Sequence, residues 1–288
     1  MSGAKRLEAD GLGTLELTEA NGYIVTNLDL GFPEVRAVTQ ARINAHGVDD
    51  STALLGARAV TFTVACFAPD DGSLSKRDVL ARLRAYANPA YRPALIWSED
   101  DGVEQRVVLR GEPPTWPLTA EGVSTKVQMA FTAPSGLLET FSTTAVVVPA
   151  VTFRESGRAY PLAYPRQYSA AAPFDAVTVA NGGLWNASVD HVTQLWGPCI
   201  GPRLLNVTSG TVLALPGLTL ADDQYAEVNT REATIQLNGR VGESLYSWQE
   251  WGTSSFWQLT GGANLLRYSP DSFGAAARAV VTYRTATL

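Results

Sequence analysis

Apolar and polar side chains alternate along much of this chain, and this alternation predicts short β-strands. In the clearest run, residues 58–67, every second side chain is apolar: Val60, Phe62, Val64 and Cys66. Similar runs occupy residues 93–98, 105–111 and 126–132, with Gly, Pro or Asp in the segments between them. Because successive side chains of a strand point to opposite faces, each run predicts a strand with one buried face.

One segment between these strands follows the helical period instead. From about residue 76 to residue 88 the apolar side chains recur at helical spacing: Val79, Leu80, Leu83 and Tyr86. Ser75 and Asp78 have the spacing of a capping box at its start. Asn88-Pro89 marks its end, because the residue before a proline is disfavoured in the α conformation. The N-terminal half is therefore predicted to consist of strands and one helix.

A block at residues 222–268 organises the C-terminal half. Asn238-Gly239 lies between strand-like runs at 233–237 and 240–241, and both residues accept the positive φ of a type I′ hairpin turn. After an aromatic loop the block continues with three further pieces: a strand-like run at 255–259, a Gly-rich turn at 261–264 and an apolar run at 265–268. This order predicts a piece of antiparallel sandwich.

The sequence pattern changes between these two halves of the chain. Pro149, Pro161 and Pro165 interrupt short apolar runs, as in an extended crossover arm. We therefore predict two domains. Residues 1–150 form the β-rich domain with the helix, and residues 151–288 form a linker arm and an outward-facing β-sandwich. Many short strands punctuated by Gly, Pro and Asn are typical of a sandwich.

The amino-acid composition narrows the classes of function that this chain could have. Of the 288 residues, 45% are hydrophobic and 17% charged, which excludes general disorder. The net charge of −6 and the absence of a dense Lys/Arg cluster argue against nucleic acid as a ligand read by sequence. Cys66 continues an apolar alternation, so we expect a buried free thiol. Neither a secretory signal nor a run long enough to span a membrane is evident. We expect a soluble protein folded in a reducing compartment.

Candidate catalytic and metal-binding residues are few. His46 and His191 lack the accompanying motif of a hydrolase or metalloenzyme, and we interpret both as ordinary loop histidines. Four Asp pairs lack the alternating spacing of a calcium loop and are better explained by turn formation: Asp49-Asp50, Asp70-Asp71, Asp100-Asp101 and Asp222-Asp223. A glycosidase would need two facing carboxylates, and no pair stands out. We expect no catalytic, cofactor or metal site, and no enzyme.

Tryptophan is concentrated in the C-terminal half. Large aromatic residues fill sandwich cores and subunit interfaces, and they also stack on sugar rings. Trp257 lies inside a predicted strand and is expected in the core. Trp248 and Trp251 lie in a predicted loop, and they are the candidate contacts with a partner protein or a glycan.

Three segments of the C-terminal block together resemble the siphophage distal tail proteins, also called the siphovirus tail component family. They are Val228–Arg231, Thr234–Gly239 and Ser255–Asn264. In the N-terminal half a strand with T-F-T-V, an acidic turn, the helix and R-V-V-L-R-G follow in the order of that family. The resemblance implies a mainly β protein: a tail-tube-like β-barrel with one α-helix, followed by a galectin-like or carbohydrate-binding-like β-sandwich.

The resemblance also implies a function. Such a protein forms a homo-hexameric ring at the distal end of a long non-contractile phage tail. The ring joins the tail tube to the tail-tip hub and receptor-binding proteins, and phage DNA passes through its lumen without specific binding. The protein would be assembled in the host bacterial cytoplasm and reside in the virion, and it needs no cofactor. An acidic channel wall would repel the DNA backbone.

The alternative is a carbohydrate-binding accessory protein that uses the C-terminal sandwich, for example on host cell-wall glycans. It explains the loop tryptophans equally well, but it does not explain the N-terminal barrel with its capped helix.

Overall fold

The computed structural model describes residues 4–36, 39–41, 48–50, 54–99, 101–112, 124–152, 176–182, 187–250 and 252–287. Within these residues the protein is mainly β, with one α-helix and several sheets, and this confirms the predicted class. The chain folds as two compact units, Met1–Ser142 with Thr287–Leu288, and Thr143–Ala286. The division falls shortly before residue 150, because the strand that follows it belongs to the second unit. No helix in the described part is long and apolar enough to cross a membrane.

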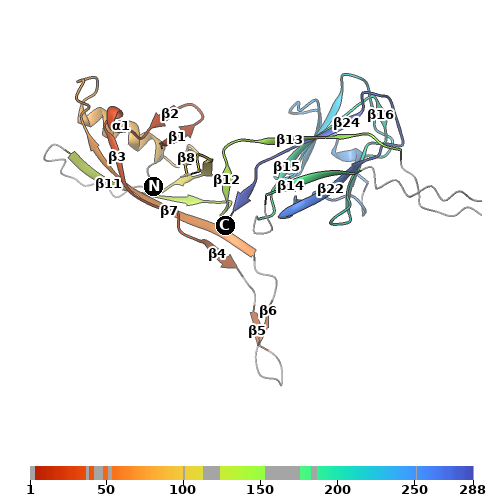
Figure 1. Ribbon diagram of the computed structural model, residues 1–288, viewed down its shortest axis with the longest axis horizontal. Coiled ribbons are helices and arrows are strands. Elements are labelled where there is room, and N and C mark those ends of the chain that lie inside the picture. Colours follow the sequence, from red (N-terminus) through yellow and green to blue (C-terminus); the bar gives the residue numbers. More distant parts are fainter. Residues whose placement is uncertain are drawn as a thin grey trace, which may run out of the picture. The chain divides into compact units, whose positions relative to one another are not determined.

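A six-stranded sheet forms one layer of the first unit (Figure 1). Its order is β2-β1-β8-β9-β12-β25, with these bounds: β1 (Lys5–Ala9), β2 (Gly13–Glu16), β8 (Ala94–Ser98), β9 (Glu104–Val108), β12 (Leu138–Thr140) and β25 (Ala286–Thr287). A 3-10 turn, η1 (Glu19–Asn21), follows β2.

The second sheet of this unit has the order β10-β11-β7-β3, and β4 also pairs with β7. Its bounds are β3 (Tyr23–Asp29), β4 (Pro33–Arg36), β7 (Leu54–Phe67), β10 (Arg110–Gly111) and β11 (Ser124–Ala133). A separate pair joins β5 (Thr39–Ala41) to β6 (Val48–Asp50). None of these sheets closes on itself within the described residues, so the closed barrel stays a prediction.

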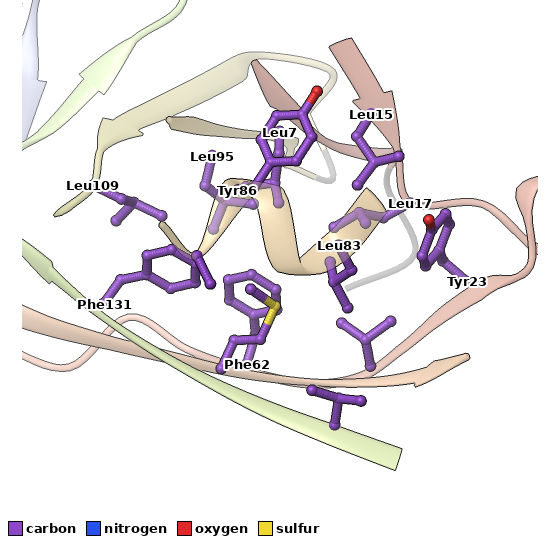
Figure 2. Packing of buried hydrophobic residues seen from close by; sticks show 14 of the residues in the cluster. Leu7, Leu15, Leu17, Tyr23, Phe62, Leu83, Tyr86, Leu95, Leu109 and Phe131 are labelled. Atoms are coloured by element: carbon purple, nitrogen blue, oxygen red, sulfur yellow. The ribbon is translucent and has the colours of Figure 1, made fainter. Parts of the chain in front are cut away.

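The core of the first unit lies between its sheets and its helix (Figure 2). The predicted alternation on β7 is confirmed, since every second residue from Val60 to Cys66 is buried. Phe62 stacks on Phe131 of β11 with ring centroids 5.3 Å apart. Burial of a large aromatic side chain contributes roughly 1.5–3 kcal/mol, so these two rings of the second sheet stabilise the core of the unit.

The helix α1 (Lys76–Tyr86) begins where the sequence predicts and ends shortly before the predicted residue 88. Ser75 accepts a hydrogen bond from the backbone N–H of Asp78, and the Asp78 carboxylate accepts one from the backbone N–H of Ser75. This reciprocal capping box satisfies two free donors at the helix start. The apolar face is buried, and Tyr23 of β3 donates a 2.8 Å hydrogen bond to the carbonyl of Val79.

Two larger sheets build the second unit (Figure 1). The five-stranded sheet has the order β13-β24-β15-β20-β21, with bounds β13 (Thr144–Pro149), β15 (His191–Trp196), β20 (Tyr225–Asn229), β21 (Thr234–Leu237) and β24 (Arg278–Tyr283). The four-stranded sheet has the order β14-β22-β17-β18, with bounds β14 (Val177–Asn181), β17 (Arg203–Asn206), β18 (Thr211–Ala214) and β22 (Gly262–Tyr268). A hydrogen bond links the two sheets, because the Tyr283 hydroxyl of β24 donates to the carbonyl of Ala180 in β14 at 2.7 Å.

Shorter elements complete the second unit. A three-stranded sheet contains β16 (Cys199–Ile200), β19 (Thr219–Leu220) and β23 (Ser272–Phe273), and a 3-10 turn η2 spans Tyr246–Trp248. The prediction for Cys66 is confirmed, since Cys66 and Cys199 are both buried free thiols. Burial raises the pKa of Cys66 to about 11, so this thiol is protonated and unreactive at neutral pH.

Two predicted strands in the C-terminal block are wrong. Asn238 and Gly239 have positive φ and form the expected tight turn, closed by the hydrogen bond from Arg240 N to Leu237 O. The chain then turns again at once, and Val241 is 93% exposed instead of lying in a strand. Residues 255–259 make only an isolated bridge, between Val189 and Leu259, and no ladder. The Gly-rich turn predicted at 261–264 is also wrong, because Gly262 to Asn264 begin β22 and pair with β14, and the apolar run at 265–268 forms the end of that strand.

Candidate functional site

The loop tryptophans were the predicted contact residues, and the structure describes one of them. Trp248 ends η2 and is 43% exposed. Two carbons of its six-membered ring lie 3.5 and 4.0 Å from the position that a Cβ atom would take at Gly217. The indole therefore rests against a glycine turn and leaves part of its surface to solvent. Trp251 lies outside the described residues.

Other aromatic residues of the same block differ in burial. Tyr246 and Phe256 stack with ring centroids 6.2 Å apart, and Tyr246 is 38% exposed. Trp257 is buried, as predicted, and lies against His191 with ring centroids 4.4 Å apart. The block thus supplies both core aromatic residues and an exposed aromatic surface.

His191 was expected to be a loop histidine, and that expectation is wrong. It is the first residue of β15 and is 3% exposed, because the strand begins one residue earlier than its polar start suggests. Its Nδ1 lies 2.8 Å from Thr193 Oγ1, and its Nε2 has no partner among the described residues. Burial lowers its pKa to about 4, although the nearby Asp190 opposes this change. His191 is therefore neutral at pH 7. His46 lies outside the described residues.

The Asp pairs behave as turn residues wherever their side chains are described. Asp71 accepts a hydrogen bond from the backbone of Ser73, and Asp101 accepts one from the backbone of Val103, each two residues ahead. These are the Asx turns that favour Asp in loops. No group of three or more His, Cys, Asp or Glu side chains within the described ranges is arranged to hold a metal ion.

A cavity of about 530 Å³ lies on the six-stranded sheet of the first unit. Its lining includes two carboxylates and two guanidinium groups: Glu8, Asp10, Arg92 and Arg106. Arg6 donates a 2.9 Å hydrogen bond to Glu8 and two further hydrogen bonds to Glu104. These bonds pair Arg6 with Glu8 and Glu104, and they hold the pKa of Glu104 below its usual range. The cavity lining is therefore charged, with as many acidic as basic side chains.

An exposed apolar patch lies along the junction of β4 and β7. Phe32 is 87% exposed, Val35 is 64% exposed and Leu55 is 43% exposed. Val35 and Leu55 are register partners, so their backbones lie side by side, and Phe32 immediately precedes β4. We call these three residues the β4–β7 patch. Sequence reasoning missed it, because a strand with an unburied apolar face has the same pattern as a strand with a buried one.

A second feature that sequence reasoning missed lies on the outward face of the five-stranded sheet in the second unit. Trp196 of β15 lies between Tyr225 of β20 and Arg278 of β24, its register partners. The Trp196 and Tyr225 ring centroids are 4.5 Å apart, and the Arg278 guanidinium carbon lies 5.1 Å from the Trp196 ring centroid. All three side chains are half-buried, as expected for a stack on an open sheet face.

The neighbouring row of the same face carries hydrogen-bonding groups. Trp196 Nε1 donates to Gln194 Oε1 at 3.3 Å, and Gln194 Nε2 donates to Glu227 Oε2 at 3.2 Å. The two Glu227 carboxylate oxygens lie 3.2 and 3.3 Å from the position of a Cβ atom at Gly239. The glycine of the Asn238-Gly239 turn thus leaves room for this carboxylate. We call Gln194, Trp196, Tyr225, Glu227 and Arg278 the stacked cluster.

Comparison with known proteins finds solved structures with a similar fold. No protein-family model and no curated protein matches the sequence. Among solved structures, the chain is similar to the Dit protein (gp 19.1) of phage SPP1, a paradigm of the hub adsorption apparatus in phages that infect Gram-positive bacteria. The TM-score is 0.64 at 14% sequence identity, and the match covers 99% of each chain.

Two further matches are chains of the phage P2 baseplate in its activated conformation. The baseplate with Ca gives a TM-score of 0.49 at 9% identity, and the one with Sr gives 0.48 at 10% identity. Each match covers 98% of both chains. The match to the SPP1 protein alone confirms, at the level of the fold, the resemblance to siphophage distal tail proteins.

Proposed function

We propose that this protein is a structural component of the hub at the distal end of a long, non-contractile phage tail. The observation that carries the proposal is the fold shared with the SPP1 Dit protein over 99% of both chains. A match confined to one unit would indicate a common β module on an unrelated protein. Here both units match in one order along the chain.

The proposed assembly is a homo-hexameric ring that continues the tail tube and carries the tail-tip and receptor-binding proteins. The β4–β7 patch supports this assembly, because exposed apolar side chains that cluster on a surface mark interaction sites. Phe32, Val35 and Leu55 would be buried against the next copy in the ring. Repeating one heterologous contact around a closed rotation generates such a ring.

The proposed role is mechanical. DNA would pass through the lumen without specific binding, since the net charge of −6 gives the chain no general attraction for phosphate. No catalytic residue or cofactor is required by this role. The protein would be assembled in the host cytoplasm and reside at the tail tip of the virion. A purely carbohydrate-binding protein would leave the first unit, with its capped helix, without a role.

The proposal is tested by the mass of the purified full chain in solution, measured by analytical ultracentrifugation over a range of concentrations. We expect a ring of about six copies for the unchanged chain. The double variant Phe32→Asp and Val35→Asp should shift the mass towards the monomer, because it places charge in the β4–β7 patch. Val241→Asp is the matched control, since Val241 is as exposed but lies in the second unit. Equal dissociation of both variants would contradict the assigned interface.

A further inference from the structure

We propose that the outward face of the five-stranded sheet in the second unit binds a neutral saccharide through the stacked cluster. This inference goes beyond the proposed tail function and does not depend on it. It moves the expected glycan contact from the loop with Trp248 to strands β15, β20 and β24.

The first argument is a hydrogen-bond relay that orients a carboxylate. Trp196 Nε1 donates to Gln194, and Gln194 donates to Glu227 Oε2. These two bonds fix the rotamers of both polar side chains before any ligand arrives. Glu227 Oε1 accepts no hydrogen bond from the described residues, and Glu227 is partly exposed. An ionised carboxylate has about four acceptor positions, so Glu227 retains acceptors for the hydroxyl groups of a sugar.

The second argument is the apolar side of the cluster. Trp196 and Tyr225 pack with centroids 4.5 Å apart, and Arg278 covers the other side of the indole. The stack is rigid, because each ring is held by a neighbour on an adjacent strand. Its exposed edges present apolar surface next to hydrogen-bonding groups. A sugar ring has the matching character, since its C–H groups and its hydroxyls lie side by side, and aromatic side chains with a polar tip suit such ligands.

The third argument is charge and the surrounding polar groups. The stacked cluster contains one cation and one anion, Arg278 and Glu227, so its net charge is zero. Beyond it, the same outward face carries half-buried amides and hydroxyls, Asn229, Thr234, Gln236 and Thr282, together with two half-buried valines, Val192 and Val280. Their strand neighbours Val228, Ile235 and Val281 are buried, which places the polar set outward. Such a face favours a neutral polyhydroxylated ligand over a phosphate-bearing polymer, which would select several cations.

The experiment measures binding of the full chain to defined oligosaccharides by isothermal titration calorimetry and saturation-transfer NMR. The probes are neutral oligosaccharides of glucose, galactose, rhamnose and N-acetylhexosamines, with polyglycerol phosphate as the charged comparison. We expect binding to at least one neutral probe. Glu227→Gln keeps the shape of the side chain but removes a charged acceptor, and should weaken binding about tenfold. Tyr225→Ala should weaken it further, and Phe273→Ala should leave it unchanged, since Phe273 is exposed on another sheet.

Three results would overturn the proposal. The first is no binding to any neutral probe, and the second is binding to polyglycerol phosphate alone. The third is a loss of saccharide binding in Trp248→Ala while Glu227→Gln and Tyr225→Ala bind normally, which would place the site at the loop. Unchanged thermal unfolding of each variant shows that the fold is intact. None of these outcomes bears on the ring, whose test is the mass of the assembly.

Discussion

The two units bury different kinds of side chain. In the first unit the buried cluster is apolar, and the fully buried charged residue among its described parts is Arg58. In the second unit the buried set includes His191, Asn181, Asn206 and Asn264. A buried polar group is stable only with its hydrogen bonds in place. The first unit therefore depends on shape and volume, and the second depends in addition on specific partners.

Asn264 illustrates this dependence. Its Oδ1 accepts hydrogen bonds from Thr260 N and Oγ1 at 3.1 and 3.0 Å, and its Nδ2 donates to Thr260 O at 2.9 Å. Asn181 Nδ2 donates to Leu259 O at 3.2 Å. Together the two amides tie the irregular segment before β22 to the four-stranded sheet. Asn264, which the sequence placed in a Gly-rich turn, thus lies within β22, and its amide holds the segment before that strand where a strand ladder is missing.

The largest effect should follow from emptying the first core. Phe62→Ala removes a ring that stacks on Phe131 and leaves a cavity in the apolar cluster. We expect a loss of about 3–5 kcal/mol in the free energy of unfolding, measured by chemical denaturation. Val241→Ala is the control, because Val241 is 93% exposed and lies outside the β4–β7 patch, and it should change stability by less than about 0.5 kcal/mol.

The second unit should be sensitive to acid through His191. Its pKa is lowered to about 4 by burial, below its usual value near 6.5, so the unfolded chain binds the proton more tightly. The stability contributed by the neutral, buried ring is present above pH 6.5 and is lost as the pH falls towards 4. The full loss is about 3 kcal/mol, from about 1.4 kcal/mol for each unit of pKa change.

This prediction is measured as unfolding free energy between pH 4 and pH 7. His191→Phe keeps a ring against Trp257 but cannot titrate, and should flatten the pH dependence over that window. If the unfolding free energy of this variant depended on pH as steeply as that of the unchanged chain, other groups would be responsible for the acid sensitivity.

A smaller loss is expected from the buried amide. Asn264→Ala leaves the Thr260 backbone and hydroxyl without their partners, and should cost about 2 kcal/mol. Gln236→Ala is the matched control, because this amide lies half-buried on the outward face. Chemical denaturation of the two variants compares them. Equal losses of stability would show that a buried amide of the second unit contributes no more through its hydrogen bonds than an amide on the outward face.

The smallest effect should come from the helix cap. Ser75→Ala removes the side-chain acceptor of the capping box and should cost about 1 kcal/mol. Asp78→Ala should cost a similar amount. Because the two residues cap each other, the double variant should lose less than the sum of the single losses. Strict additivity, measured by thermal unfolding, would contradict the reciprocal box.

Local signals in the sequence were enough to predict the helix, its cap, the alternation on β7 and the Asn238-Gly239 turn. Each of these features depends on residues that lie close together in the sequence. The stacked cluster was not predictable in this way, because Trp196 meets Tyr225 and Arg278 only through long-range strand pairing. The strand predicted at 255–259 failed because its backbone bonds go to separate segments, such as Val189, and to side chains. For Trp248, the sequence indicated an aromatic side chain in a loop, but it did not indicate which residues that side chain contacts.

The central claim, that this chain assembles into a tail hub ring, is tested most directly by electron microscopy of the purified protein in negative stain. We predict closed rings of about six copies around an open lumen. They should be abundant in the unchanged chain and rare in the variant with Asp at Phe32 and Val35. Separate single particles without rings at the highest concentration reached would contradict the claim.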